Sequence, residues 1–279
     1  MSISSIRINN RAASILQAGD VIAQRAYYGQ SFVFGAFDPI ILFDDGEQGA
    51  FYDPSDLSTL FQDDAGTTPV TEPGQTVGLM LDKSGNDNHV TQPTEESRPV
   101  YQAGGGLHWL EFDGVDDSLF SASSVTLLNK TINVFMGMQV TDVSRQARFL
   151  MHGNFGNAFW MGLNDVDDGL TWSVREGQPS IYPAAASIIP EDNAFVVSAT
   201  GDINTYTAEL EINNNGIISD TGGSADFSFG TDTLYVFRRH IGTEHVEGRL
   251  YNMVIVEGDV IGFREGIKKW IGQRTGVTL

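Results

Sequence analysis

Residues 131–140 read TINVFMGMQV, and an apolar side chain occupies every second position. Side chains of an extended chain point alternately to its two faces, so the apolar ones would share a single face. These residues are Ile132, Val134, Met136, Met138 and Val140. A repeat of two, rather than the spacing of three and four found in amphipathic helices, predicts a β-strand with one face in the core.

The same alternation recurs in residues 205–212, TYTAELEI, and the turn residues Asn213–Gly216 follow directly. An Asn-Gly pair after alternating residues is a strong indication of a β-hairpin. Other short runs with strand character are separated by polar turn residues, and they lie at 107–113, 147–152, 157–163, 169–175, 193–200, 233–239 and 248–256. Many short strands of this kind predict an all-β fold, either a sandwich or a barrel.

One amphipathic helix is expected near the C-terminus. Asp259 is a candidate N-cap residue, and Gly276 can end the helix in a left-handed conformation. The residues that form one apolar stripe between them are Phe263, Ile267, Trp270 and Ile271. A short helix with a single apolar stripe is expected to cover the sandwich rather than to bind a partner.

The composition excludes several classes of protein. Of the 279 residues, 41% are hydrophobic and 19% are charged, which is enough apolar material for a folded core. The net charge of −20 repels nucleic acid and anionic lipid, and no apolar run is long enough for a membrane span. The lack of cysteine excludes disulfides, thiolate zinc sites and cysteine nucleophiles. We therefore expect no nucleic-acid partner and no membrane span.

The charge is distributed unevenly along the chain. Residues 1–37 hold three arginines and one aspartate, a net charge of +2, so the rest of the chain carries −22. A basic segment before an acidic body is typical of a docking arm, although a basic edge of the same domain would look alike. The arm also contains the apolar strip Phe32-Val33-Phe34, which a short arm cannot bury alone. We expect this arm to contact other subunits.

Residues 44–104 differ from both neighbours, because they are rich in Asp, Gly, Pro, Ser and Thr and have few strand-like runs. Long irregular connections are usually functional or interfacial. We therefore divide the chain into an N-terminal docking arm (1–43), an irregular linking segment (44–104) and a β-sandwich (105–279). An apolar cluster in the linking segment has little core to join and indicates an interface between copies; its members are Leu57, Leu60 and Phe61.

Residues 51–101 contain three distinctive blocks, YDPSDLSTLFQD (52–63), GQTVG (74–78) and DKSGNDNH (82–89). In this order, the blocks resemble a segment of tailed-phage and prophage virion proteins. In those proteins the segment leads into a laminin-G-like or concanavalin-A-like lectin domain. One departure is Asp87, where a small residue such as Gly is usual, and it concerns the turn within the third block.

Later stretches resemble parts of that lectin domain. Residues 110–117, LEFDGVDD, are similar to its opening strand and turn, and residues 248–256, GRLYNMVIV, to its closing strand. Residues 270–277, WIGQRTGV, resemble the tail behind that strand. The resemblance implies an antiparallel jelly-roll β-sandwich over about residues 100–279, with an extended N-terminal arm and a short C-terminal helix. The strand pattern predicts the same fold class independently.

The resemblance also implies a role. The chain would be a phage virion structural protein, assembled in the host cytoplasm, and a tail-fibre or receptor-binding component that attaches to a host-surface glycan. Its arm would dock onto other virion proteins, and analogy with phage fibres implies a homo-oligomer, most simply a trimer. Two alternatives remain open: a capsid or tail decoration protein without a specific receptor, and a glycan hydrolase.

Three carboxylates bear on the hydrolase alternative. Glu111, Asp113 and Asp116 have the spacing E-x-D-x-x-D. Some jelly-roll glucanases carry E-x-D-x-x-E on one strand, since retaining hydrolysis needs two carboxyl groups about 5–5.5 Å apart. Here the third residue is the shorter Asp, and Gly114 indicates that the strand ends within the motif. The pattern favours a solvated acidic turn, and we expect no enzymatic activity.

Calcium is the one cofactor that the sequence leaves open. Glu176 lies at position 12 counted from Asp165, as in an EF-hand loop, but Gly169 falls at position 5, where an acid is needed. An EF-hand is therefore rejected. Laminin-G-like folds often carry a calcium ion in a loop, and such a site remains open at Asp165, Asp167, Asp168 and Glu176. No other cofactor is expected.

Aromatic residues gather within residues 155–182, interleaved with Asn and Asp. Sugars stack on aromatic faces and form hydrogen bonds with amides and carboxylates, so these residue types suit a glycan site. Our candidate binding residues are the stacking rings Trp160 and Trp172, with hydrogen bonds from Asn157, Asn164 and Asp165. The alternative is ordinary core, because aromatic residues at alternating strand positions commonly pack between sheets.

Overall fold

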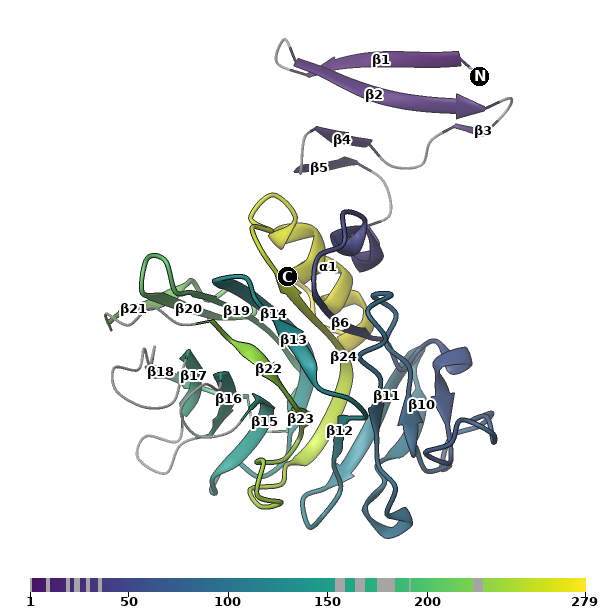
Figure 1. The fold of residues 1–279 in the computed structure, drawn as a ribbon, viewed down its shortest axis with the longest axis vertical. Coiled ribbons are helices and arrows are strands. Elements are labelled where there is room, and N and C mark those ends of the chain that lie inside the picture. The colour runs from purple at the N-terminus through teal and green to yellow at the C-terminus, as the bar shows by residue number, and fades with distance from the viewer. Residues whose placement is uncertain are drawn as a thin grey trace.

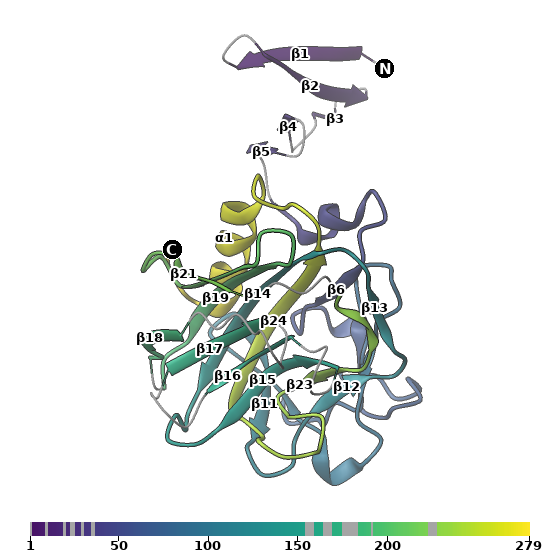
Figure 2. The ribbon, with the colours of Figure 1, turned by 60° about the vertical axis from the view of Figure 1, so that its left-hand side comes forward.

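The structure is a computed structural model. It describes residues 37–153, 159–163, 169–174, 189–190, 192–222 and 228–279, and the backbone of residues 184–188 and of five strands between residues 2 and 34. Two antiparallel β-sheets pack face to face, and one helix lies on the outer face of the first sheet (Figures 1 and 2). The fold is thus an all-β, jelly-roll-like sandwich with a short C-terminal helix, as predicted. No helix among the described residues is long and apolar enough to span a membrane.

The first sheet is built around two central strands, β14 (Thr131–Val140) and β24 (Glu247–Glu257), which pair with each other. Its order is β10-β11-β24-β14-β19-β20-β21, and β6 also pairs with β24. The other strands are β6 (Gly49–Tyr52), β10 (Val100–Gly104), β11 (Leu107–Asp113), β19 (Phe195–Asp202), β20 (Thr207–Ile212) and β21 (Ile218–Thr221). The predicted hairpin after residue 212 is confirmed, because β20 and β21 pair across it.

The second sheet has the order β18-β17-β16-β15-β23-β12-β9-β8-β7. Its strands are β7 (Leu60–Phe61), β8 (Leu79–Met80), β9 (Val90–Thr91), β12 (Leu119–Ser121), β15 (Ala147–His152), β16 (Phe159–Leu163), β17 (Gly169–Val174), β18 (Ala184–Ile188) and β23 (Leu234–Val236). A separate pair joins β13 (Val125–Leu127) to β22 (Gly230–Asp232).

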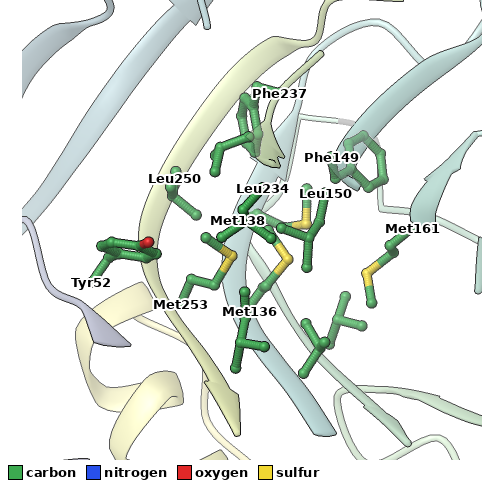
Figure 3. Packing of buried hydrophobic residues seen from close by; sticks show 14 of the residues in the cluster. Tyr52, Met136, Met138, Phe149, Leu150, Met161, Leu234, Phe237, Leu250 and Met253 are labelled. Carbon is green, nitrogen blue, oxygen red and sulfur yellow. The ribbon is translucent and has the colours of Figure 1, made fainter. Parts of the chain in front are cut away.

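The main core lies between the two sheets. All five apolar residues of the 131–140 alternation are buried in it, so the predicted core face of β14 is confirmed. Figure 3 shows Met138 of β14 and Leu250 of β24 with Leu150 from the second sheet. The opposite face of β14 is buried as well, and Phe135 on that face is 0% exposed. The alternation predicted the core face, but the cover on the other face comes from a distant helix.

Helix α1 (Arg264–Thr275) packs on the outer face of β14, β19 and β24. Its apolar side contributes Ile267 and Trp270 to a second core, which also contains Phe135. Glycine at position 137 permits this close approach, because a Cβ there would lie 2.1 Å from Thr275 Oγ1 of the helix. The helix therefore covers the sheet, as its single apolar stripe predicted.

Only one of the two predicted ends of α1 is correct. Gly276 follows the helix with a φ of 78°, and its N–H donates to the carbonyl of Gly272, as expected of a left-handed C-terminal cap. Asp259 is not the N-cap. Its Oδ1 accepts a hydrogen bond from the amide of Ile261 at 3.0 Å in a turn that precedes the helix. Aspartate stabilises turns and helix starts by the same bond, so the sequence cannot separate the two.

Residues 44–104 belong to the sandwich, so the expected linking segment and the boundary at residue 104 are wrong. β6 pairs with β24 in the first sheet, and β7, β8 and β9 extend the second sheet. The core residues that the segment contributes include Tyr52, Leu60, Val77, Met80 and Val90. Strands β7, β8 and β9 have 2 residues each, which is too short for alternation to be visible in a sequence.

Two of the three residues in the apolar cluster that indicated an interface between copies belong to or pack against this core instead, and the third, Phe61, is half-buried in β7. Leu60 is fully buried, and Leu57 packs against the same residues. The sequence suggested an interface because the segment was taken to have no core of its own. A homo-oligomer, and the trimer in particular, therefore loses this argument and rests on analogy with phage fibres.

The DKSGNDNH block forms a turn around the buried Asp82. Asp82 Oδ1 accepts hydrogen bonds from the amides of Phe51 at 2.8 Å and Ser84 at 2.9 Å, and Oδ2 accepts one from Asn88 at 3.0 Å. Asp87, the departure from the resembling sequences, has a φ of 57°. Glycine adopts this left-handed conformation most readily and aspartate tolerates it, so the substitution keeps the shape of the turn.

The N-terminal arm ends before residue 43. The short 3₁₀ helix at Pro39–Phe43 places Leu42 and Phe43 in the core beneath α1, and the Phe37 ring lies 6.4 Å from that of Phe263. Before it, β1 (Ser2–Ile8), β2 (Arg11–Ala18) and β3 (Val21–Ile22) form one antiparallel unit, and β4 (Ala26–Tyr28) pairs with β5 (Ser31–Phe34). Both units lie beyond the sandwich in Figures 1 and 2. The side chains of the strip Phe32-Val33-Phe34 are outside the described residues.

Candidate functional site

Trp172, one of the two rings expected to stack on a sugar, is buried between the sheets. Its exposed fraction is 0%, and its ring lies 5.4 Å from that of Phe159. Its Nε1 donates to the carbonyl of Thr200 in the opposite sheet at 3.2 Å. Trp172 therefore offers no face to a ligand, and the core alternative holds for this residue.

Trp160 points to the outer face of the second sheet, but it is only 5% exposed. The guanidinium carbon of Arg148 lies 4.0 Å from the centre of its ring, and Met151 and Tyr235 pack beside it. This ring is therefore covered as well. The other candidate binding residues, Asn157, Asn164 and Asp165, lie outside the described residues, and so do the candidate calcium ligands Asp165, Asp167, Asp168 and Glu176.

The carboxylates of the E-x-D-x-x-D motif serve the fold. Glu111 Oε1 lies 3.4 Å from Arg249 Nε, and Asp113 Oδ1 accepts a hydrogen bond from the amide of Val115 at 2.8 Å, which shapes the turn after β11. Asp113, Asp116 and Asp117 form the one group of acidic side chains, among the described residues, close enough to share a metal ion. The site is not assigned a metal, because hydrogen bonds within the turn already account for its shape.

Asp117 is the buried member of this acidic group. It is 6% exposed, and its Oδ2 accepts a hydrogen bond from the amide of Asp113 at 3.0 Å. Burial raises the pKa of Asp117 to about 7, and the neighbouring charges of Asp113 and Asp116 act in the same direction. The turn at the end of β11 therefore changes its charge near neutral pH.

An aromatic and charged surface lies on the outer face of the first sheet, in the part that α1 leaves open. We call it the Trp109 surface, and it consists of Trp109, Glu111, Gln139, Arg249 and Tyr251. Three neighbouring strands supply these residues in register, because Glu111 of β11 and Gln139 of β14 both pair with Arg249 of β24. Leu110 and Phe112, which alternate with Trp109 and Glu111 along β11, point into the core. The pleat of β11 therefore directs Trp109 and Glu111 outward together.

Contacts among these side chains hold Trp109 in place. Its Nε1 donates to Glu111 Oε2 at 2.8 Å, the guanidinium carbon of Arg249 lies 4.8 Å from its ring centre, and the Tyr251 ring lies 5.8 Å away. Burial alone would lower the pKa of Arg249, but Tyr251 and Glu111 together raise it, so the guanidinium stays charged. Trp109 is half-buried, while the side chains of Glu111 and Arg249 are 41% and 33% exposed.

A pocket of about 340 Å³ adjoins the Trp109 surface at the C-terminal end of α1. Tyr251 belongs to both, so the pocket continues the surface along the helix. The polar side chains that line it are Ser55, His108, Tyr251, Gln273 and Arg274. His108 is positioned by a 2.7 Å hydrogen bond between its Nδ1 and the hydroxyl of Tyr101. The arrangement offers an aromatic platform beside a cluster of hydrogen-bonding groups, which is a common composition for a polar small-molecule site.

One sign of this surface is visible in the sequence. Residues 109–112 read WLEF, and their alternation places Trp109 and Glu111 opposite the apolar Leu110 and Phe112. A tryptophan on the polar face of a strand is a candidate for exposure. The rest of the surface leaves no local sign, because it joins residues 138 positions apart, Glu111 and Arg249. Aromatic residues that are close in sequence therefore indicated residues 155–182 instead.

No protein-family model matches the chain, and no curated protein matches its sequence. Its fold, however, is found in solved structures. One is domain 4 of AbnA, a GH43 extracellular arabinanase from Geobacillus stearothermophilus, in complex with arabinotriose. The similarity has a TM-score of 0.56 at 13% identity and covers 80% of this chain and 98% of that domain.

In two other similar structures, the matching region is only part of the solved chain. An arabinofuranosidase complexed with arabinofuranosyl-α-1,2-xylobiose has a TM-score of 0.56 at 10% identity, over 85% of this chain and 65% of its own. The binding domain of botulinum neurotoxin serotype D has a TM-score of 0.52 at 10% identity, over 70% of this chain and 48% of its own. This chain thus spans about half the length of the toxin domain. At such identities the similarity shows the fold alone: the chain is an antiparallel, jelly-roll-like β-sandwich.

Proposed function

We propose that this chain is a glycan-binding protein of a phage virion and that it binds a host-surface glycan through the Trp109 surface. The observation that carries the binding site is the half-buried Trp109, held by Glu111 and Arg249 beside a pocket with polar side chains. An aromatic ring supplies an apolar face for the C–H groups of a sugar. Carboxylate, amide and guanidinium groups can then bind its hydroxyls in a fixed orientation.

The contacts of Trp109 favour binding because they reduce the cost of ordering the site. The ring is already oriented by its hydrogen bond to Glu111 and by the stacked Arg249. A side chain that is fixed before the ligand arrives loses little conformational entropy on binding. The similar fold of the AbnA domain, whose structure holds arabinotriose, is compatible with this proposal.

Binding without cleavage is the favoured activity. Both glycosidase mechanisms require two carboxyl groups on opposite sides of the scissile bond, one of which must be free to donate a proton. Glu111 is the one carboxylate among the residues that define the Trp109 surface, and it is engaged by Trp109 and Arg249. Asp113, two residues further along β11, shapes the following turn.

The virion part of the proposal rests on the resemblance of residues 52–63, 74–78 and 82–89. Contacts join the three blocks in space, because Lys83 Nζ lies 2.7 Å from Asp56 Oδ2 and the amide of Gly78 donates to the carbonyl of Phe61 at 2.9 Å. Their distinctive residues therefore serve the folding of one edge of the sandwich. Detection of this chain in purified particles by mass spectrometry is the direct test, and its absence from them would contradict this part.

The binding site is tested by Trp109→Ala in a glycan array and in attachment to host cells. Removal of a stacking ring from a binding hot spot is expected to cost about 2 kcal/mol, roughly a thirty-fold loss of affinity. Tyr235→Ala is the matched control, because Tyr235 is a half-buried ring under a guanidinium on the opposite sheet, with Arg238 Cζ 5.6 Å from its centre. Unchanged binding by Trp109→Ala would refute the site. If the wild-type protein binds no glycan, the decoration-protein alternative replaces the proposal.

A further inference from the structure

The end of the sandwich where the N-terminal arm is attached contains an acidic pocket of about 590 Å³. One wall is formed by the 3₁₀ helix at 39–43 and the residues that follow it, and the other by the turn between β24 and α1. The carboxylates that line it are Asp44, Asp45, Glu47, Glu257 and Asp259. The lining contains no lysine or arginine. Among the described residues, the lining therefore has five acidic side chains and no basic side chain of its own.

The same pocket has apolar residues in its walls, and exposed apolar residues are next to the lining residues in sequence. Leu42, Val260 and Phe263 line it, and they belong to or pack against the core beneath α1. Ile40, Leu128 and Ile261, which are next in sequence to lining residues, are 38%, 65% and 71% exposed. They are three of the six large apolar side chains that are most exposed among the described residues. A partner that fits must combine positive charge with apolar side chains.

The walls of the pocket are well ordered by hydrogen bonds. Glu257, which is 6% exposed, accepts a hydrogen bond at Oε1 from the amide of Asn129 at 2.6 Å. The amide of Asp45 donates a hydrogen bond to Glu47 Oε2 at 3.1 Å, and this bond joins two acidic residues of the same wall. A preformed cavity of this kind binds a partner without a large ordering cost.

This chain carries a segment with the required chemistry. Residues 1–37 have a net charge of +2, against −22 for the rest of the chain, and they combine apolar and polar residues, as in ISSIRI (3–8) and AASIL (12–16). Their strands pair with one another and lie beyond the sandwich (Figures 1 and 2). As far as the structure describes the chain, the lining of the acidic pocket begins at Ile41. We infer that the acidic pocket binds the basic N-terminal arm of a second copy of this chain.

The geometry allows such an exchange. The arm leaves the sandwich at Phe37, four residues before the lining residue Ile41, so each copy presents its arm and its pocket at the same end. Each copy then offers one arm and accepts one arm, and such contacts close into a ring or a reciprocal dimer.

This inference goes beyond the proposed glycan binding and does not depend on it. The pocket of the Trp109 surface is lined by Gln273 and Arg274 at the C-terminal end of α1, whereas the acidic pocket is lined by Phe263, which precedes the N-terminal end. Twelve helical residues separate the two ends, about 18 Å. The mass of the oligomer tests binding of the arm, and glycan affinity tests the role of Trp109. Failure of either proposal can therefore be distinguished from failure of the other.

The test is a charge-reversal exchange on the full-length chain, with mass measured by light scattering during gel filtration. One variant reverses the pocket (Asp44→Lys with Asp45→Lys), and the other reverses the arm (Arg7→Glu with Arg11→Glu). We expect the wild-type protein to be an oligomer that dissociates as salt screens the charges, and each variant alone to be a monomer. An equal mixture of the two variants should assemble again, because each reversed arm then meets a reversed pocket.

The control is Glu95→Lys with Glu96→Lys, which reverses two adjacent exposed acids away from the pocket and should leave the mass unchanged. A monomeric wild-type protein at micromolar concentration would overturn the inference. Reversed variants that remain oligomers would also overturn the inference, and so would a mixture of the two variants that stays monomeric. Either result would mean that the arm does not bind the acidic pocket of a second copy.

Discussion

Trp109 and Trp160 lie on the outer faces of the two sheets, and they differ in what their neighbours leave open. Each has an arginine over its ring, Arg249 at 4.8 Å and Arg148 at 4.0 Å. Trp109 is half-buried and donates its Nε1 to Glu111. Trp160 is 5% exposed, and its Nε1 has no hydrogen-bond partner within the described part of the chain.

The strand position of a tryptophan determines which side of the sheet its ring lies on. The elements packed around the ring then determine whether a face of it stays open to a ligand. The outward Trp109 has charged neighbours that orient it and leave part of it open. The outward Trp160 packs with Met151 and Tyr235 in a small apolar cluster. Glycan binding should therefore depend on Trp109, and stability should depend on the covered rings.

The largest expected effect is loss of stability on truncation of a covered ring. Trp172→Ala removes a fully buried side chain from between the sheets and should lower the free energy of unfolding by about 3–5 kcal/mol. Trp109→Ala, at a half-buried site, should lower it by about 1 kcal/mol. Urea unfolding measures both. An equal loss for the two variants would mean that Trp109 is core, and the comparison would fail.

A smaller effect concerns the turn that ends β11, the strand of Trp109. The pKa of Asp117 is about 7 in the folded protein and about 3.9 in an unfolded chain. The folded state therefore holds a proton between these values that the unfolded state has lost, and this contribution to stability disappears as the pH rises from about 4 to about 7. Asp117→Asn carries no such charge and should be more stable than the wild type at pH 8, on the order of 2 kcal/mol.

Unfolding of both proteins at pH 8 and near pH 4 measures this difference, and the advantage of Asp117→Asn should shrink toward the lower pH. An advantage that is the same at both pH values would show that the charge of Asp117 is not its cause.

The smallest effect separates the two outward tryptophans by their indole N–H groups. Trp109→Phe removes the bond from Nε1 to Glu111 and should weaken glycan binding by about 1 kcal/mol, roughly five-fold. Trp160→Phe removes an N–H that has no partner among the described residues, so it should leave glycan affinity unchanged. Equal affinity for the two variants would show that the hydrogen bond to Glu111 does not position the binding ring.

Local features of the fold were predictable wherever a pattern extended over enough residues to show its period. The alternation in residues 131–140 identified the core face of β14, and the Asn-Gly turn after residue 212 identified the hairpin. Gly276 was recognisable as the helix end because only a residue that tolerates a φ of 78° serves there. The strands within residues 44–104 could not be predicted in this way, because strands β7, β8 and β9 have 2 residues each and show no period.

The sequence by itself determined the fold class, the core face of the central strands and the presence of a covering helix. These properties depend on neighbours two to four positions apart. Only the tertiary structure decided which tryptophan is open, because exposure depends on what distant segments bring to the same place. Trp172 meets Thr200 of the opposite sheet, and Glu111 meets Arg249 from 138 positions away. A local sequence pattern cannot indicate contacts between such distant residues. For this reason the sequence indicated Trp160 and Trp172 as the candidate site, whereas the tertiary structure indicates Trp109.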